Sequence, residues 1–473
     1  MTRWGKRWTA WLALPLLLLS GGAFAADVDG AQLSAIWGVP FAGILLSIAL
    51  MPLLVPQFWH HHYGKVAAAW GLAFLVPFAM VFGTAAAGAN TVHALFAEYI
   101  PFIILLTALF TVSGGIFIRG NLHGSPGLNT AILAIGAVLA SFMGTTGASM
   151  LLIRPLIRAN DNRKHVAHVV VFFIFIVSNA GGSLTPLGDP PLFLGFLKGV
   201  DFFWTVKTIF PETLFLVGSL LAIFFALDSW FYHRREEVLP QDPTPDSRGI
   251  GFDGAINFWL LAAVVGLVLM SGFWKSPVSF NIYGTEVGLP GVLRDVGLVA
   301  LTFLSLKITP AKVHADNQFG WGPMAEVAKL FAGIFLTIIP VIAMLKAGVN
   351  GPFGAVVQAV TRPDGSPDVM MYFWITGALS SFLDNAPTYL VFFNTAGGDP
   401  KVLMTTLAPT LAAISAGAVF MGANTYIGNA PNLMVKAIAE DRGVKMPSFF
   451  GYMLWSGAVL IPLFVVMSFI WFK

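Results

Sequence analysis

The chain has 473 residues, of which 57% are hydrophobic and 10% charged, and its mean hydropathy is +0.79. A soluble fold cannot cover so much apolar surface with so few polar side chains, so lipid is the expected solvent. The formal net charge is only +3 and the basic residues are scattered, which argues against a nucleic-acid partner. Because cysteine is absent, disulfides, thiolate metal sites and cysteine nucleophiles are excluded.

The N-terminus has the pattern of an export signal. Basic residues come first, an apolar run follows over 8–19, and Ala23-Phe24-Ala25 has the small-x-small spacing of a signal peptidase site. We predict a signal peptide over 1–25. An uncleaved first helix is the alternative, and in both cases the residues that follow begin outside the membrane.

Further along the chain, eight apolar stretches approach the roughly 20 residues that a membrane-crossing helix needs. They lie near 35–57, 66–87, 93–118, 208–228, 255–273, 295–309, 324–345 and 449–471. Counting crossings from an outside start leaves more Lys and Arg on the cytoplasmic side, as the positive-inside rule requires. We therefore expect a multi-pass protein of the bacterial inner membrane, with the lipid bilayer as its main partner.

The chain divides into two related halves. A polar, Pro-rich stretch over 232–254 predicts a cytoplasmic linker between a first half, 26–231, and a second half, 255–473. A shift of 240 residues places Ser141-Phe142-Met143 on Ser381-Phe382-Leu383 and Gly188-Asp189-Pro190-Pro191 on Gly428-Asn429-Ala430-Pro431. The counted topology gives the copies opposite orientations, and inverted repeats are typical of transporters.

Four further segments are apolar but interrupted. A hairpin is predicted over 128–158, with Gly144-Thr145-Thr146-Gly147 at its middle, and a second over 369–398, with Asp384-Asn385-Ala386-Pro387-Thr388. Broken helices are predicted over 165–197 and 402–440, where glycines, prolines and asparagines force the backbone to unwind. The expected fold is therefore all-α and polytopic, with two inverted repeats, re-entrant helical hairpins and discontinuous transmembrane helices.

These interruptions contain the candidate site. Unwound backbone in a membrane has to line a cavity or be buried in protein, and its carbonyls and helix ends can then bind ions. Asp189 and Asp384 are the carboxylates within the interruptions, and each has an alternative role as a helix cap. The predicted sodium and proton ligands are Asp189, Asp384, Asn179 and Asn424. The predicted substrate-binding residues are Ser178, Thr185, Thr145, Thr146, Asn385, Thr388, Thr425 and Asn429.

Other polar groups are weaker candidates. Glu98, Asp228 and His93 lie near predicted span ends, where a solvated interfacial position is expected. His60-His61-His62 is not expected to bind a metal, because adjacent residues do not converge on one metal ion. The run is expected in a cytoplasmic loop at the membrane interface.

At these motifs the sequence resembles the ion transporter superfamily, in particular its arsenite permease and NhaD-type sodium:proton antiporter branch with citrate transporter-like relatives. The resemblance rests on Ser178-Asn179, Gly188-Asp189-Pro190-Pro191, the second hairpin tip and Gly422-Ala423-Asn424-Thr425 with Gly428-Asn429. It implies a scaffold domain of a kind that often forms a homodimer, and an elevator-like movement of the transport domain. Antiporter-type relatives often carry Asp-Asn at the first hairpin tip, where this chain has Thr145-Thr146.

The leading hypothesis is sodium:proton antiport by alternating access, with sodium ion and proton competing for a carboxylate. The alternative is cation-coupled transport of a carboxylate such as citrate, or of another anion. Neither a cofactor nor an enzyme activity is expected, because no catalytic residues cluster in the interruptions.

Overall fold

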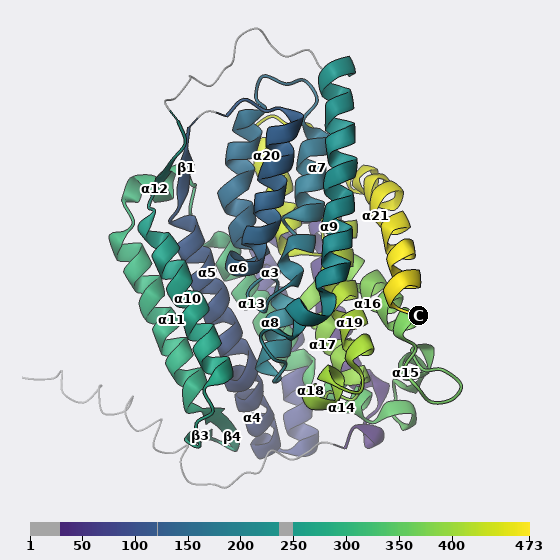
Figure 1. Cartoon of the computed structure of the whole chain (residues 1–473). Coiled ribbons are helices and arrows are strands. Elements are labelled where there is room, and N and C mark those ends of the chain that lie inside the picture. The colour runs from purple at the N-terminus through teal and green to yellow at the C-terminus, as the bar shows by residue number, and fades with distance from the viewer. Residues whose placement is uncertain (1–28, 121, 236–248) are drawn as a thin grey trace, which may run out of the picture.

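The computed structural model describes residues 29–120, 122–235 and 249–473. Within these ranges most of the chain is helical, and its strands form two two-stranded antiparallel sheets. Eight of its helices are long and apolar enough to cross a membrane, so the predicted all-α polytopic fold is confirmed (Figure 1). The predicted signal peptide lies outside the described residues, as does most of the predicted linker.

Long apolar helices from both halves of the sequence form a first helix group, whose members pack on one another. The group consists of α2 (Val39–Leu54), α3 (Pro56–Phe82), α4 (Thr84–His93), the π-helical turn η3 (Ala94–Tyr99), α5 (Ile100–Gly114), α10 (Ile256–Phe273), α11 (Leu289–Ile308) and α13 (Gly322–Thr337). After a bend of 42°, α13 is continued by α14 (Ile339–Lys346).

The interrupted segments and the two helices that follow them form a second helix group. Its members are α6 (Pro126–Ala159), α7 (Ala167–Ile176), η4 (Ala180–Ser183), α8 (Pro190–Leu197), α9 (Trp204–Trp230), α16 (Val369–Phe382), α17 (Asn385–Thr395), α19 (Ala408–Met421), η7 (Gly422–Asn424), α20 (Ala430–Asp441) and α21 (Phe449–Trp471). The apolar half-helices α7 and α19 are buried along nearly their whole lengths, so neighbouring helices rather than lipid surround them.

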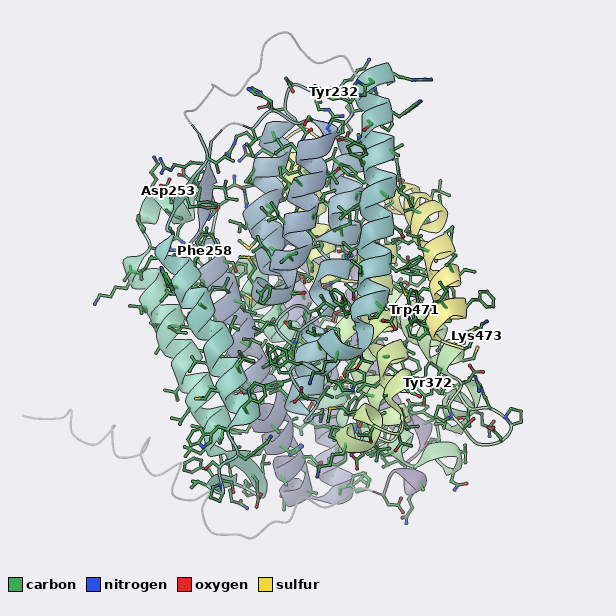
Figure 2. All side chains as sticks on the ribbon, in the orientation of Figure 1. Tyr232, Asp253, Phe258, Tyr372, Trp471 and Lys473 are labelled. Atoms are coloured by element: carbon green, nitrogen blue, oxygen red, sulfur yellow. The ribbon has the colours of Figure 1, made fainter. Side chains whose placement is uncertain are left out.

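Short elements connect the helices. They are η1 (Gly30–Gln32), η2 (Ala35–Gly38), β1 (Phe117–Arg119), η5 (Phe231–Arg235), β2 (Gly251–Asp253), β3 (Ser279–Ile282), β4 (Thr285–Gly288), α12 (Ala311–Asp316), η6 (Gly348–Asn350), α15 (Gly354–Ala359) and α18 (Pro400–Met404). Tyr232 and Asp253, which flank the undescribed part of the linker, lie at the same end of the molecule (Figure 2).

Some predicted spans match the helices closely and others are displaced: the span predicted over 93–118 runs from Thr84 to Gly114. The predicted 449–471 span is α21, and the predicted 208–228 span lies within α9. The predicted loop position of His60, His61 and His62 is wrong, because α3 already begins at Pro56. Proline is well suited to the first turn of a helix, so the helix starts before this polar stretch.

The first hairpin folds back on itself. A straight helix of the length of α6 would span about 50 Å. Its two ends instead meet: the Gly124 amide donates to the Ala159 carbonyl over 2.5 Å, and the Asn129 and Asn160 side-chain amides bond each other. The reversal occurs at Gly144, whose φ of +79° suits glycine.

The second hairpin, formed by α16 and α17, has the opposite orientation. Its arms contact through Tyr372 and Phe392, whose ring centroids are 6.3 Å apart. Its base lies toward α15 and α18, whereas the base of the first hairpin lies at the end with β1 (Figure 1). The predicted inverted arrangement of re-entrant hairpins is therefore confirmed.

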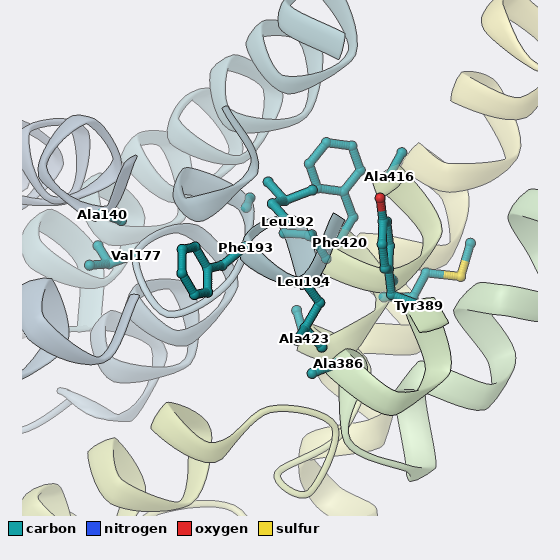
Figure 3. Packing of buried hydrophobic residues seen from close by; sticks show 14 of the residues in the cluster. Ala140, Val177, Leu192, Phe193, Leu194, Ala386, Tyr389, Ala416, Phe420 and Ala423 are labelled. Carbon is teal, nitrogen blue, oxygen red and sulfur yellow. The ribbon is translucent and has the colours of Figure 1, made fainter. Parts of the chain in front are cut away.

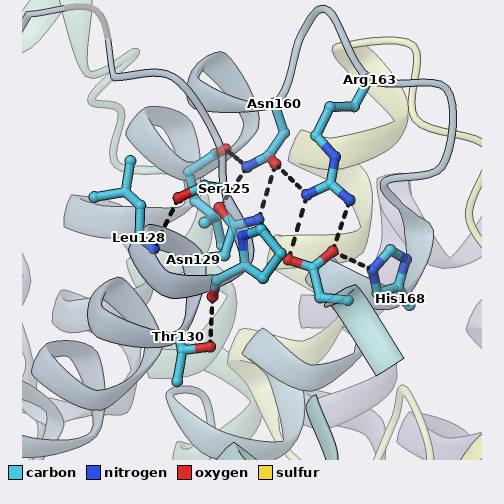
Figure 4. Close-up of polar contacts among 10 residues, drawn as sticks. Ser125, Leu128, Asn129, Thr130, Asn160, Arg163 and His168 are labelled. Atoms are coloured by element: carbon cyan, nitrogen blue, oxygen red, sulfur yellow. Dashed lines mark hydrogen bonds and ion pairs between the residues drawn. The ribbon is translucent and has the colours of Figure 1, made fainter. Parts of the chain in front are cut away.

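A buried polar network closes the base of the first hairpin (Figure 4). Asp228, at the end of α9, accepts hydrogen bonds from Arg163 at 2.7 Å and from Asn129 at 3.0 Å, and pairs with His168 at 2.8 Å. The Asp228 side chain is fully buried. The expectation of a solvated interfacial position for Asp228 is wrong, because the carboxylate joins α6, α7 and α9.

We expect Asp228→Ala to lower the free energy of unfolding by about 3–5 kcal/mol, because it removes the carboxylate from a buried ion pair. The midpoint of thermal unfolding in detergent measures the loss. The matched control is Ser468→Ala at the equivalent repeat position, where the hydroxyl bonds only the Val465 carbonyl within α21. Equal midpoints for the two variants would contradict the role assigned to the network.

Candidate functional site

In each of the two broken helices, the unwound segment crosses closely over the backbone at the end of its own half-helix. A Cβ added at Gly188 would lie 2.1 Å from the Gly182 carbonyl oxygen, and one added at Gly428 would lie 2.5 Å from that of Gly422. Both distances are too short for any side chain. The glycines at these equivalent positions therefore allow each unwound strand of backbone to pass over its own half-helix.

Threonines attach each break to the hairpin of the same half. The Thr185 hydroxyl donates to the Ser141 carbonyl and accepts from the Leu187 amide at 3.2 Å. Thr425 makes the same two bonds, to the Ser381 carbonyl and from the Ile427 amide. These bonds satisfy backbone groups that the missing helix turns leave free, as burial in a membrane requires.

Four helix N-termini meet at one place because of these breaks. They begin at Thr145 in the second arm of α6, at Asp189 before α8, at Asp384 before α17 and at Asn429 before α20. All four residues line one cavity. Helix N-termini carry partial positive charge, so this point favours negatively charged groups.

Asp189 occupies the centre of the arrangement and is only 1% exposed. Its Oδ1 accepts from the Thr145 hydroxyl at 2.9 Å and from Asn429 Nδ2 at 3.2 Å, while its Oδ2 accepts from Asn385 Nδ2. The cap alternative does not hold for Asp189, because its side chain makes no capping bond to α8. All three of these hydrogen-bond donors are neutral.

Asp189 and its three partners form two pairs of repeat-equivalent residues. Thr145 of the first hairpin tip corresponds to Asn385 of the second, and Asp189 corresponds to Asn429, 240 residues later. Both hairpin tips therefore donate to a single carboxylate, which the first half alone supplies. The site is shared by the two halves but asymmetric in charge.

An asparagine network continues from this centre into the protein. Asn429 Nδ2 also approaches the Asn179 side-chain oxygen at 3.2 Å and the Ser178 carbonyl at 3.1 Å. Asn179 in turn donates to Asn432 at 2.8 Å. Ser178 pairs through its hydroxyl with Ser149 at 2.8 Å. The network joins the breaks of the two halves directly.

Asp384 has two roles. Its carboxylate accepts from the Ala386 amide at 3.1 Å, so the cap alternative is confirmed, and it also lines the cavity. The side-chain oxygens of Asn385, which follows Asp384 directly, and of Asn424 are buried and make no hydrogen bond within the described residues. Such oxygens are hard ligands of the kind that bind alkali and alkaline-earth cations.

The cavity lies between the two helix groups. It contains about 880 Å³ of empty space, part of it open to solvent. The first group supplies an apolar wall from α5 and α13, including Leu109, Phe110 and Phe331, and the second group supplies the polar side. No Lys, Arg or His lines it among the described residues. The cavity therefore combines two carboxylates with no basic side chain.

The structure separates the sequence-predicted residues into three sets. Those that line the cavity are Asp189, Asp384, Thr145, Thr146 and Asn429. Asn385, Asn179 and Ser178 lie next to them through the bonds above. Thr185, Thr425 and Thr388 use their hydroxyls on backbone carbonyls, and Asn424 donates to Ser381.

Sequence reasoning missed two contributors. One is Asn432, three residues after Asn429, whose side-chain amide donates to the Gly422 and Thr425 carbonyls at 2.9 Å each. The other is the apolar wall from α5 and α13. In the sequence, the residues that form this wall look the same as apolar residues that face lipid.

We expect Gly188→Ala to prevent correct folding of the site, because the added methyl group would overlap the Gly182 carbonyl. Size-exclusion profiles and thermal unfolding in detergent check this. Gly127→Ala, in the same helix group but with no atom within 4 Å of the new methyl group, should leave both unchanged. A Gly188→Ala protein as stable as the control would show that the crossing tolerates a side chain.

Comparison with known proteins agrees with this geometry. A family model described as "Putative citrate transport" matches residues 30–472, nearly the whole chain. A search of the curated proteins finds no match. The family match confirms the resemblance that the motifs indicate, and it covers both halves together with the hairpins and breaks. The chain therefore belongs to this citrate-transport family of multi-pass membrane proteins.

Proposed function

We propose that the protein is a sodium:proton antiporter of the bacterial inner membrane, in which the two ions compete for Asp189. One observation carries the proposal: a buried carboxylate lies where both halves meet, bonded by neutral donors, in a cavity without basic side chains. A carboxylate in a membrane is costly unless it is protonated or paired with a cation. Proton and sodium ion can each meet that requirement, and each excludes the other.

This competition explains coupling without a second site. The carboxylate can move across the membrane barrier only when it is neutralised, so an empty, charged Asp189 would hold the transporter in place. Asp384 adds a second negative charge to the same cavity, and the free side-chain oxygens of Asn385 and Asn424 are further candidate ligands for the cation.

A second candidate is cation-coupled uptake of a carboxylate such as citrate. The family description supports it, and so does the convergence of four helix N-termini, which suits an anion. In this case Thr145 and Thr146 would donate to the substrate carboxylate, while the cation at Asp189 offsets its charge.

We expect Asp189→Asn to abolish ion-driven proton movement while the protein still folds. Asparagine keeps the size of the side chain but removes the charge that binds sodium ion or proton. The measurement is the fluorescence of a pH-sensitive dye in proteoliposomes with an imposed proton gradient, challenged in turn with sodium, lithium, potassium and citrate. Antiport predicts that sodium collapses the gradient with the unchanged protein and not with the variant.

The control is Asp316→Asn, at the end of α12 and away from the cavity, which should transport normally. Asp384→Asn is a sharper comparison, because asparagine caps a helix as well as aspartate does. Its α17 should therefore stay intact, and any loss reports on the charge. Normal sodium-driven transport by Asp189→Asn would rule out the assignment of Asp189.

The same vesicles decide between the two candidates. If citrate, and not sodium alone, moves with protons, the second candidate replaces the first. Thr146→Ala should then raise the citrate concentration needed for half-maximal uptake, because one donor to the carboxylate is lost, by about fivefold to tenfold. Under sodium:proton antiport the same variant should leave the sodium response nearly unchanged.

A further inference from the structure

Helix α8 connects Asp189 in the candidate site to the first helix group. It is a single helix of eight residues that begins directly after Asp189 and ends directly before Lys198. A helix of this length is a rigid rod of about 12 Å. Any force that holds Lys198 therefore also fixes the position of Asp189.

One side of α8 belongs to the second helix group. Leu194 points toward Ala386 of α17 (Figure 3). A Cβ added at Gly195 would lie 2.4 Å from the Tyr389 hydroxyl, so no side chain separates the two helices. Because of this close packing, α8 and α17 have to move together.

The other side of α8 faces the first helix group. Phe193 points away from Tyr389 (Figure 3), and the Arg294 guanidinium of α11 lies 5.8 Å from the centre of its ring. One turn on, Phe196 contacts α10 at Gly272, where an added Cβ would be 3.0 Å from the ring. At the end of the helix, the Lys198 ammonium forms an ion pair with Glu98.

Glu98 is fixed to the first helix group. It lies in the π-helical turn η3, and the hydroxyl of its neighbour Tyr99 donates to the Ala328 carbonyl of α13 at 2.9 Å. Glu98 is 6% exposed, so the expected interfacial position of this residue is wrong. His93 is within electrostatic range of Glu98, yet the direct contact of the carboxylate is with Lys198.

We propose that the Glu98–Lys198 ion pair is a latch between the two helix groups, closed in this conformation and opened in every transport cycle. Glu98 and Lys198 are then positioning residues for Asp189, which they control through α8. The proposal rests on the proposed function only in requiring alternating access, in which one helix group moves against the other. An ion pair across that boundary has to break when the groups move.

Charge exchange provides the first test. Glu98→Lys and Lys198→Glu should each lower the maximal transport rate by about tenfold or more, because each places like charges together in a largely buried position. The double exchange should restore most of the rate. The matched control exchanges Lys436 and Glu440, an ion pair within α20 that does not cross the boundary, and should change little.

The absence of native cysteine makes a second test clean. In the variant with both Glu98→Cys and Lys198→Cys, a short bis-methanethiosulfonate reagent links the two positions. The thiols that remain unreacted are then labelled with a maleimide polymer and counted by their shift on gels, which gives the linked fraction. Linked protein should transport at less than about a tenth of the unlinked rate and recover after reduction. The Lys436→Cys and Glu440→Cys pair should transport equally well when linked. Full transport by the linked Glu98 and Lys198 variant would overturn the proposal.

Amide hydrogen exchange tests whether the latch opens, independently of which ion or substrate is transported. It needs no transported ion, so it remains informative even if none of the tested ions moves and the proposed function fails. If the latch opens in solution, linking should slow amide exchange over residues 186–198 severalfold relative to unlinked protein. Equal exchange in linked and unlinked protein would show that the pair does not open, and the latch would be rejected.

Discussion

The rule that backbone polar groups cannot face lipid governs the whole second helix group. Each half contains a hairpin tip and an unwound helix, and each of these frees amides and carbonyls that water cannot reach. The structure satisfies many of them by crossing the interrupted segments over one another. Thr185 bonds the Ser141 carbonyl, Thr425 bonds the Ser381 carbonyl, and the Thr145 amide donates to the Gly188 carbonyl at 2.8 Å. The candidate site is a consequence of this arrangement, because it brings four helix N-termini together.

The two halves repeat the backbone but not the charges. Asp189 and Asn429 occupy equivalent positions and contact each other, so one carboxylate serves both halves. The hairpin bases differ as well. Asp228 and Arg163 close the first base, whereas the second is closed by Phe373 and Phe472, whose rings stack at 4.5 Å. The two halves therefore share the backbone arrangement around the cavity but differ in which side chains carry charge.

The two helix groups contribute different kinds of side chain to the cavity. The first group offers the cavity an apolar wall, and the acids and asparagines lie on the second group. Among the contacts of the described residues, only Glu98 and Lys198 form an ion pair between the first group and the end of α8, the helix that follows Asp189. Asp189 at one end of α8 and the Glu98–Lys198 ion pair at the other are thus linked by a rigid element.

The sequence by itself determined the membrane fold, the position of the repeat and the segments that unwind, because hydropathy, glycines and prolines act locally and their spacing is visible in one dimension. It also identified Asp189 and Asp384 as the carboxylates of the interruptions. Only the tertiary structure showed that Thr185 and Thr425 hold backbone carbonyls, that Asn385 and Asn429 reach Asp189 from the other half, and that Glu98 and Asp228 are buried. These outcomes depend on contacts between residues about 40 to more than 200 positions apart, and such contacts are fixed by packing in three dimensions rather than by local pattern.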